Sequence, residues 1–309
     1  MRIAVIGAGG VGGVFGAALL RGGADVVFVA RGAHLAALQR DGLRIESGAG
    51  EVRFAGPVSA AADPREVGPV DVIIFAVKLW DLAAAAAAAR PLVGPSTFVV
   101  ALQNGVEAAD IVASALPGTT VLDGIAFVAA RIDAPGIIRQ TGTMATMTFG
   151  PRRGPITDPM RELERLARAG GMTGGTTERV EVLLWEKLVF LASISGVGAA
   201  ARQPIGVIRA RPETRALLRT AIAEVTAVGQ AREVPLEADL VERTLATVDG
   251  LPAETRSSMH QDLEAGGRLE LPWLSGAVVR LGREAGVPTP VHATLLGVLS
   301  PYVDGAAPS

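Results

Sequence analysis

The chain has 309 residues, of which 49% are hydrophobic, 19% charged and 4% aromatic, and its formal net charge is −2. This length predicts about two domains, and the apolar composition excludes a disordered chain. The small net charge and scattered arginines argue against nucleic acid as a partner. The chain has no cysteine, which excludes disulfides and cysteine-based zinc sites, and the distant His34, His260 and His292 lack ligand spacing, so we expect no metal.

The sequence gives no sign of a targeting or membrane segment. No window approaches ~18 uninterrupted apolar residues, and "MRIAVIGAGG" enters a strand pattern without a signal peptide ahead of it. We therefore expect a cytoplasmic protein that does not bind membranes.

The first 179 residues alternate between short apolar runs and helical stretches, as parallel βαβ units do. We predict parallel strands over 2–7, 25–30, 70–77 and 97–103, with helices over 80–90 and 106–115. Further strand signals are spaced like an antiparallel or mixed edge of the same sheet, over 120–132, 136–142 and 144–150. Residues 1–179 are thus predicted to form an α/β Rossmann domain with a doubly wound, mainly parallel sheet.

Residues 180–309 are predicted to form a second, all-α domain. Strand signals stop after about residue 178, and residues 180–302 have the pattern of helices about 10 to 20 residues long. Proline and glycine mark the breaks between these helices, at "QPIG", "ARPET", "REVP", "DGLPAE" and "GVPTP".

A glycine motif lies between the first strand and the first helix, with Gly7, Gly9 and Gly12 in "MRIAVIGAGGVGGVFG". This context is typical of a dinucleotide-binding turn: Gly7 allows the tight turn, Gly9 lets the backbone approach the pyrophosphate, and Gly12 packs helix on strand. We expect the cofactor to contact the whole turn, namely Gly7, Ala8, Gly9, Gly10, Val11 and Gly12. The alternative is a glycine-rich turn in an α/β fold that binds nothing.

The end of the second strand predicts which dinucleotide binds. An NAD site normally has Asp or Glu there, which binds the ribose 2′-hydroxyl. Here "VVFVARGAH" ends in Arg31, and Asp25 lies at the other end of the strand. Because a guanidinium can hold a 2′-phosphate and stack on adenine, we predict NADP(H) as the cofactor.

Two further strand ends carry polar side chains. Lys78 follows "FAV", and Gln103 and Asn104 follow "AL". Ligands of open α/β sheets collect at the carboxyl ends of strands, so we expect these residues at the cofactor. Alternatively, Lys78 is a solvated residue at a helix start and "QNG" is a simple turn.

The run "VLLWEKLVFLASISG" places Lys187 on an almost wholly apolar helix, on one stripe with Leu183, Leu184, Leu191 and Ile194. One interpretation is a lysine whose ammonium reaches water along its own stem. The other is a lysine kept in a cleft for chemistry. Desolvation would lower its pKa and a buried carboxylate would hold it charged, which makes an amine into a proton donor.

These motifs occur together in one order: the glycine turn, then "VK", "LQNGVE", "WEKL" and "SSMHQDL…LELPWLSG". In this the sequence resembles the ketopantoate reductase (2-dehydropantoate 2-reductase) family over nearly its whole length. The resemblance implies a homodimeric reductase that binds NADPH on a Rossmann domain and closes a helical domain over a 2-oxo acid. The implied reaction is reduction of 2-dehydropantoate to (R)-pantoate, in pantothenate biosynthesis.

The resemblance also implies roles for single residues. Lys187 matches the family's general-acid lysine, and Asn104 an asparagine beside substrate and nicotinamide. Lys78 matches a lysine near the cofactor phosphate, Ser258 a serine that binds the substrate carboxylate, and Glu270 a glutamate that contacts the substrate and the lysine. Without the resemblance, Glu270 could merely favour a helix dipole and Ser258 could be a helix N-cap.

The lysine helix departs from the family pattern, which has asparagine four and eight positions after the lysine, where this chain has Leu191 and Ser195. We expect both to line the substrate, and Leu191 to disfavour a substrate hydroxyl. A more hydrophobic 2-oxo acid, or an imine, is therefore the alternative substrate. A non-catalytic NADPH sensor is a further alternative, against which Lys187 and Glu270 argue together.

Overall fold

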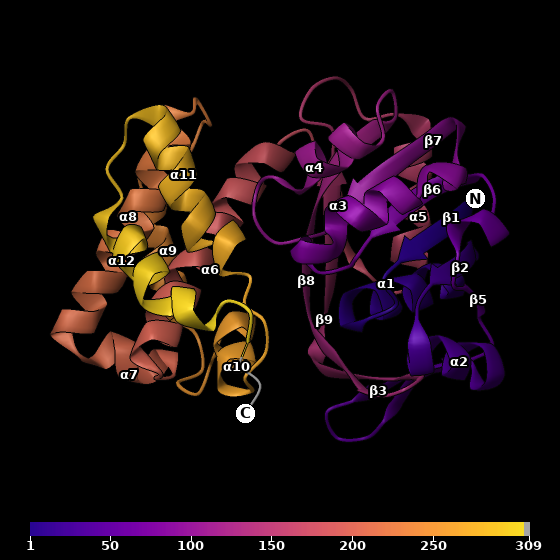
Figure 1. The fold of residues 1–309 in the computed structure, drawn as a ribbon, viewed down its shortest axis with the longest axis horizontal. Coiled ribbons are helices and arrows are strands. Elements are labelled where there is room, and N and C mark those ends of the chain that lie inside the picture. Colours follow the sequence, from indigo (N-terminus) through magenta and orange to yellow (C-terminus); the bar gives the residue numbers. More distant parts are fainter. Residues whose placement is uncertain (306–309) are drawn as a thin grey trace. The chain divides into compact units, whose positions relative to one another are not determined.

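The computed structural model describes residues 1–305 and divides the chain into two compact units (Figure 1). The first unit comprises residues 1–103 and 107–180. The second comprises residues 104–106 together with the chain from Glu181 onward. The short segment 104–106 therefore lies among the residues of the first unit in sequence but belongs to the second.

The first unit is built on a sheet of ten strands, counted within residues 1–305, in the order β4-β3-β9-β8-β7-β6-β1-β2-β5, with β10 paired to β9. All pairs are parallel except β3 with β4 and β8 with β9. The strands are β1 (Arg2–Ile6), β2 (Asp25–Val29), β3 (Leu43–Ser47), β4 (Val52–Gly56), β5 (Ser59–Ala61), β6 (Val70–Phe75), β7 (Val93–Ala101), β8 (Thr120–Ala134), β9 (Ile137–Gly150) and β10 (Thr173–Thr176). The predicted mainly parallel sheet is confirmed.

Helices α1 (Gly10–Arg21), α2 (Gly32–Asp41), α3 (Leu79–Ala88), α4 (Ala108–Ala115) and α5 (Asp158–Ala169) connect and cover these strands. Helix α1 packs against α5, β8 and β9, while α3 packs against α4. Strands β1 and β6 are buried at all but one position each, as parallel strands covered on both faces should be. Strand β2 lies on one side of β1, whereas β6, β7 and β8 follow one another on its other side, so the strand order reverses between β1 and β6. Ligands of doubly wound folds bind at such a reversal.

The predicted additional edge differs from the structure in two ways. Residues 137–150 form one strand, β9, whose pairing with β8 shifts register between Val128 and Ala129, rather than two separate strands. The β8–β9 pair also lies inside the sheet, because β3 adds to the far side of β9 and β4 follows it. Elements β3, β4, β5, β10, α2 and α5 were not predicted; the strands among them are short, and β4 has no fully buried residue.

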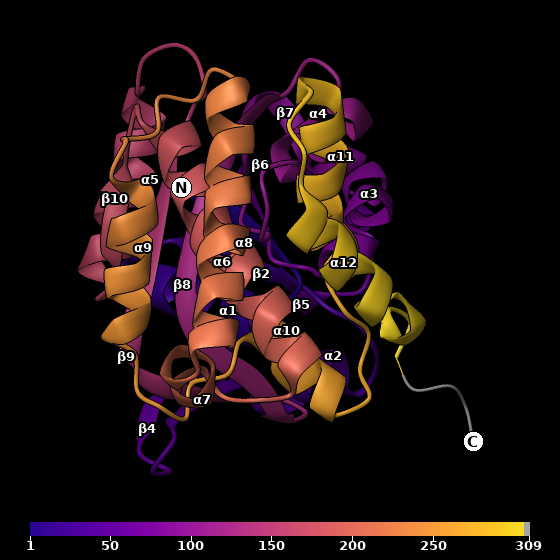
Figure 2. The same ribbon diagram turned by 90° about the vertical axis from the view of Figure 1, so that its left-hand side faces the viewer.

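The second unit is helical, as predicted (Figure 2). Its helices are α6 (Val180–Ala201), α7 (Ile205–Ala210), α8 (Pro212–Ala231), α9 (Leu240–Asp249), α10 (Ser258–Glu264), α11 (Ser275–Ala285) and α12 (Pro290–Leu299). All five predicted breaks fall between helices, because proline and glycine interrupt the helical hydrogen bonds there. Residues 265–274, between α10 and α11, form a sixth break that the sequence did not predict.

Helix α8 lies at the centre of this unit, in contact with α7, α9, α11 and α12. Its buried Glu224 accepts hydrogen bonds from the backbone N–H groups of Val291 (2.8 Å) and His292 (3.0 Å), and so caps the start of α12. The fully buried ring of His292 contacts Ser275 Oγ at 3.2 Å and the Ala221 carbonyl oxygen at 3.1 Å. Burial lowers the pKa of His292 to about 4, so the ring stays neutral at physiological pH.

By length and composition alone, α6 is the one described helix that could cross a membrane, but 72% of its most apolar window is buried. A core helix has the same composition, so this is weak evidence for a span.

Candidate active site

The glycine turn follows β1 at the reversal of the strand order. Gly7 has φ +97°, and a Cβ there would lie 2.9 Å from the Val77 nitrogen; at Gly12 a Cβ would lie 2.0 Å from the Gly7 carbonyl oxygen. At Gly9, the N-cap of α1, an added Cβ would meet nothing within 4 Å. The turn is therefore closed against the protein at Gly7 and Gly12 and open at Gly9, which leaves room for a ligand to approach the backbone there.

The other residues of the turn pack within the first unit. Ala8 is buried and Val11 is partly exposed. Gly10 lies against β8, because a Cβ there would be 2.1 Å from the Ala130 carbonyl oxygen. The side chain of His34, which the sequence analysis considered only as a metal ligand, reaches the turn with its Nε2 2.9 Å from the Ala8 carbonyl oxygen.

Arg31 follows β2 directly and is the N-cap of α2. Its side chain is exposed, and its guanidinium makes no hydrogen bond or ion pair with another residue of the described part of the chain. Asp25 is the first residue of β2, at the opposite end of the strand, and its Oδ2 lies 3.6 Å from Nε of Arg2. The end of β2 therefore presents a cation and no carboxylate.

Lys78 and Gln103 also lie at the carboxyl edge of the sheet, beyond β6 and β7. Lys78 is exposed at the N-cap of α3, with its ammonium 5.4 Å from the centre of the Trp80 ring. Gln103 is 6% exposed and donates from Nε2 to the Val77 carbonyl oxygen at 3.0 Å. Its buried Oε1 has no hydrogen-bond partner within residues 1–305, so it remains available to a ligand donor.

Three residues from distant parts of the sequence come together in the second unit. Asn104 Nδ2 donates a hydrogen bond of 3.1 Å to Glu270 Oε2. Gly105 holds this segment close, because its φ is +89° and a Cβ there would lie 3.1 Å from the Trp273 carbonyl oxygen. The carboxylate of Glu270 also acts on Lys187 of α6: burial lowers the pKa of the Lys187 amine to about 8, and Glu270 opposes this by raising it.

Glu270 is 5% exposed and precedes a short 3-10 helix, Leu271–Trp273, inside the break that the sequence did not predict. A buried carboxylate needs a cation or hydrogen-bond donors, and the Asn104 amide and the Lys187 amine supply them. Lys187 itself is partly exposed, as are Leu183 and Leu191, one turn before and after it on α6. An amine with a pKa of about 8 is mostly protonated at physiological pH and releases its proton more readily than an ordinary lysine, so it can act as a general acid.

The remaining predicted substrate residues differ in their surroundings. Leu191, one turn beyond Lys187, is partly exposed, whereas Ser195 is fully buried and its Oγ has no hydrogen-bond partner among the described residues. Ser258 is exposed at the start of α10, and the N-cap is its neighbour Ser257, whose Oγ accepts from the His260 N–H at 3.2 Å. The alternative that Ser258 is the N-cap is therefore wrong by one residue.

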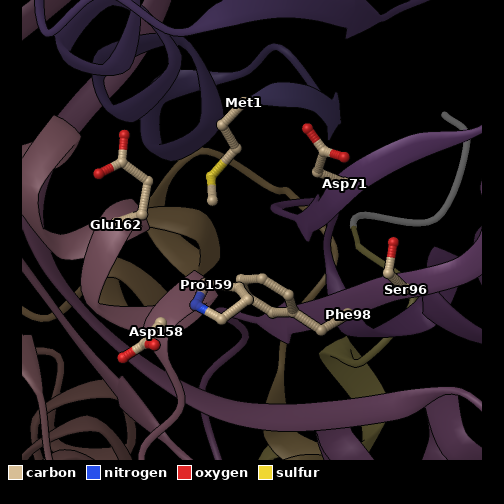
Figure 3. Close-up of a pocket in the computed structure, with 7 residues that line it drawn as sticks. All are labelled: Met1, Asp71, Ser96, Phe98, Asp158, Pro159 and Glu162. Atoms are coloured by element: carbon tan, nitrogen blue, oxygen red, sulfur yellow. The ribbon is translucent and has the colours of Figure 1, made fainter.

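A hollow of about 410 Å³ lies elsewhere in the first unit (Figure 3). It opens near the amino ends of β6 and β7, opposite the glycine turn, and is lined by Met1, Asp71, Ser96, Phe98, Asp158, Pro159 and Glu162. Three of these side chains are carboxylates, which disfavours a phosphate ligand. No group of three or more His, Asp or Glu side chains that could hold a metal ion occurs within residues 1–305.

A glycine turn at the strand-order reversal of a doubly wound sheet, with a helical unit that places an amine beside a carboxylate, defines a two-unit oxidoreductase that uses a dinucleotide. Comparison with known families specifies the class further. Residues 3–154 match the model "Ketopantoate reductase PanE/ApbA", and residues 179–303 match the model of the C-terminal part of the same family. The chain belongs to the ketopantoate reductase family, whose members are NAD(P)-dependent and reduce 2-oxo acids.

Individual relatives match over nearly the whole chain. A 2-dehydropantoate 2-reductase of Halobacterium salinarum is 33% identical, over 96% of each chain. The crystal structure of a PanE/ApbA family ketopantoate reductase from Ralstonia eutropha superposes with a TM-score of 0.87 at 32% identity, over 98% of each chain. A D-mandelate dehydrogenase solved with NADH and anilino(oxo)acetate has a TM-score of 0.88 over 98% of each chain, but at 20% identity it shows a shared fold alone.

Proposed function

We propose that this protein uses NADPH to reduce 2-dehydropantoate to (R)-pantoate, in the cytoplasm and as a homodimer. The observation that carries the proposal is the group of Lys187, Glu270 and Asn104, in which a buried carboxylate contacts an amide and acts on an amine of lowered pKa. The choice of substrate is supported by relatives that are 2-dehydropantoate 2-reductases, such as the protein of Halobacterium salinarum.

In this proposal the bound dinucleotide supplies the hydride to the substrate's C2. Lys187 donates a proton to the carbonyl oxygen, which becomes the hydroxyl of the product, and its charge stabilises the oxygen as it turns negative. Glu270 raises the pKa of Lys187 and so keeps the amine protonated. Asn104, oriented by Glu270, hydrogen-bonds the substrate.

The choice of NADPH over NADH rests on the end of β2. The exposed guanidinium of Arg31 can pair with a 2′-phosphate, and the carboxylate that would bind a 2′-hydroxyl is missing there. The D-mandelate dehydrogenase of the same fold was solved with NADH, so the fold by itself does not select the cofactor. We assign Lys78 to the cofactor phosphates, and Gln103 and the glycine turn to the rest of the dinucleotide.

Leu191 supports a second candidate substrate, a more hydrophobic 2-oxo acid. It lies one helical turn from Lys187, is partly exposed, and offers no polar group to a substrate hydroxyl. Ser195, the other departure from the family pattern, has a free but fully buried hydroxyl. We expect Leu191→Asn to raise kcat/KM for 2-dehydropantoate relative to 2-oxo acids with plain alkyl side chains.

The proposal is tested by steady-state rates with a panel of 2-oxo acids, each with NADPH and with NADH. We expect the highest kcat/KM with 2-dehydropantoate and NADPH. The purified enzyme's mass in solution, from light scattering, tests the dimer. A chain that binds NADPH but turns over no 2-oxo acid would replace the proposal with the sensor alternative.

A further inference from the structure

His34 makes two contacts with the backbone of the first unit, and neither belongs to its own helix. The residue lies in the first turn of α2, and its ring is partly buried. Its Nε2 is 2.9 Å from the carbonyl oxygen of Ala8 in the glycine turn. Its Nδ1 is 3.1 Å from the backbone nitrogen of Gly136, in the tight turn between β8 and β9.

The two partners fix the protonation of the ring. The Gly136 N–H can only donate, so Nδ1 must accept and carries no proton. The Ala8 carbonyl can only accept, so Nε2 carries the proton and donates it. The neutral Nε2–H form of His34 therefore satisfies both ring nitrogens, with partners 102 and 26 residues away in sequence. The ring joins α2 to two separate turns of the first unit.

The bond to Ala8 also orients the next peptide group. In a trans peptide the C=O and the following N–H point in opposite directions, and no cis peptide occurs in the described chain. With its carbonyl turned to His34, the Ala8–Gly9 peptide must direct the Gly9 N–H away from the ring. Gly9 is the position in the turn where an added Cβ meets nothing within 4 Å. Backbone N–H groups at a helix start are the donors that bind phosphate.

We propose that His34 is a positioning residue for the cofactor: by holding the Ala8 carbonyl it aims the Gly9 N–H at the pyrophosphate of the dinucleotide. This inference rests on the proposed use of a dinucleotide. It also gives a reason for the position of His34 on α2, since that helix begins beside Arg31. The adenosine end and the pyrophosphate of the cofactor are thereby held by one connected set of residues.

Two substitutions separate the two contacts of the ring. In His34→Gln the side-chain amide can place an N–H near the position of Nε2, which keeps the donor to Ala8. In His34→Asn the shorter amide can place its oxygen near the position of Nδ1, which keeps the acceptor for Gly136 and loses Ala8. We expect the Kd for NADPH, measured by fluorescence titration, to rise about three- to tenfold in His34→Asn, as for loss of one orienting hydrogen bond. It should stay near the wild-type value in His34→Gln.

A ligand without a pyrophosphate provides the control. Adenosine 2′-monophosphate can engage Arg31 but not the Gly9 N–H, so its Kd should be equal in both variants and the wild type. Equal NADPH affinity in His34→Asn and the wild type would overturn the proposal. So would a parallel loss of both ligands, because this would indicate a general disturbance of the unit. If the wild type binds no dinucleotide at all, the proposed function fails, and the His34 inference with it.

If neither variant folds, a measurement on the wild-type protein tests the proposed role of His34. In ¹⁵N-labelled wild type, long-range ¹H–¹⁵N correlation spectra report which ring nitrogen is protonated. We expect the Nε2–H form of His34 in the free protein and a change in its ring signals when ADP-ribose is added. An Nδ1–H form, or signals that ADP-ribose leaves in place, would contradict the proposal.

Discussion

The lowered pKa of Lys187 predicts how the rate should depend on pH, and Glu270→Gln tests the cause. Glutamine retains an oxygen that can accept the hydrogen bond from Asn104, so the substitution removes the charge and preserves the contact. Since the carboxylate of Glu270 raises the pKa of Lys187, its removal should lower that pKa further below the wild-type value of about 8. The protonated amine is the form that donates.

The size of the effect follows from the titration of one group. With a pKa of about 8, roughly nine-tenths of the Lys187 side chains are protonated at pH 7 and roughly one-tenth at pH 9. The wild-type kcat/KM for reduction should therefore be level below about pH 7 and fall about tenfold per pH unit well above pH 8. Each unit by which Glu270→Gln lowers the pKa moves this fall one unit toward acid; a one-unit shift would leave about half the amines protonated at pH 7.

The assay is the initial rate of NADPH oxidation with the best 2-oxo acid across the pH range, for the wild type, Glu270→Gln and Lys187→Met. We expect Lys187→Met to lose about 10²- to 10⁴-fold in kcat and to lose the fall near pH 8 altogether. If Glu270→Gln leaves the midpoint in place or moves it to higher pH, the carboxylate does not hold the amine charged. If Lys187→Met keeps the wild-type fall, another group donates the proton.

Three further predictions concern the glycine turn, the end of β2 and the helical core. Gly9→Ala should unfold at the wild-type temperature but bind NADPH more weakly, because its Cβ meets no protein atom within 4 Å. Gly12→Ala should lose about 1–3 kcal/mol of stability, because its Cβ would lie 2.0 Å from a backbone oxygen. Equal melting temperatures of the two variants would contradict this contrast. Arg31→Ala should raise the Kd for NADPH about tenfold or more and leave the Kd for NADH unchanged. An equal change in both Kd values would show that Arg31 does not bind the 2′-phosphate. Glu224→Ala should lower the free energy of unfolding in urea by about 1–3 kcal/mol, because two backbone N–H groups of α12 lose their acceptor. An unchanged urea midpoint would show that water replaces the carboxylate as acceptor.

The elements that the sequence predicted are those whose signal is local. The central strands are short apolar runs, because a parallel strand covered on both faces needs apolar residues at nearly every position. Strand β4 has an arginine and no fully buried residue, so its pattern differs little from that of a loop. Strand β3 alternates apolar and polar residues but is only five residues long, which makes its signal weak. Helix α5 does carry a signal, with Met160, Leu163, Leu166 and Ala167 buried at helical spacing.

In the candidate site, too, the sequence predicts the features with a local signal and not the contacts between distant residues. The glycine turn and Arg31 could be located because their chemistry is encoded in neighbouring residues. The contact between Asn104 and Glu270 spans 166 positions and depends on the close approach of Gly105 to the Trp273 backbone, which no local pattern reveals. The contacts of His34 with the Ala8 carbonyl and the Gly136 N–H were not predicted, because both of its partners are main-chain atoms. A motif search records side-chain identities and therefore cannot detect such a contact.

The assignment of residues 104–106 to the second unit affects any attempt to build chimaeras in this family. A gene cut at residue 180 leaves Asn104 on one fragment and its partner Glu270 on the other, although both belong to one compact body. If the helical half came from a relative, residues 104–106 of one parent would have to pack against the segment around Glu270 of the other parent. A chimaera that keeps the Asn104–Glu270 hydrogen bond of one parent therefore takes two segments from that parent, residues 104–106 and the chain from residue 181 onward.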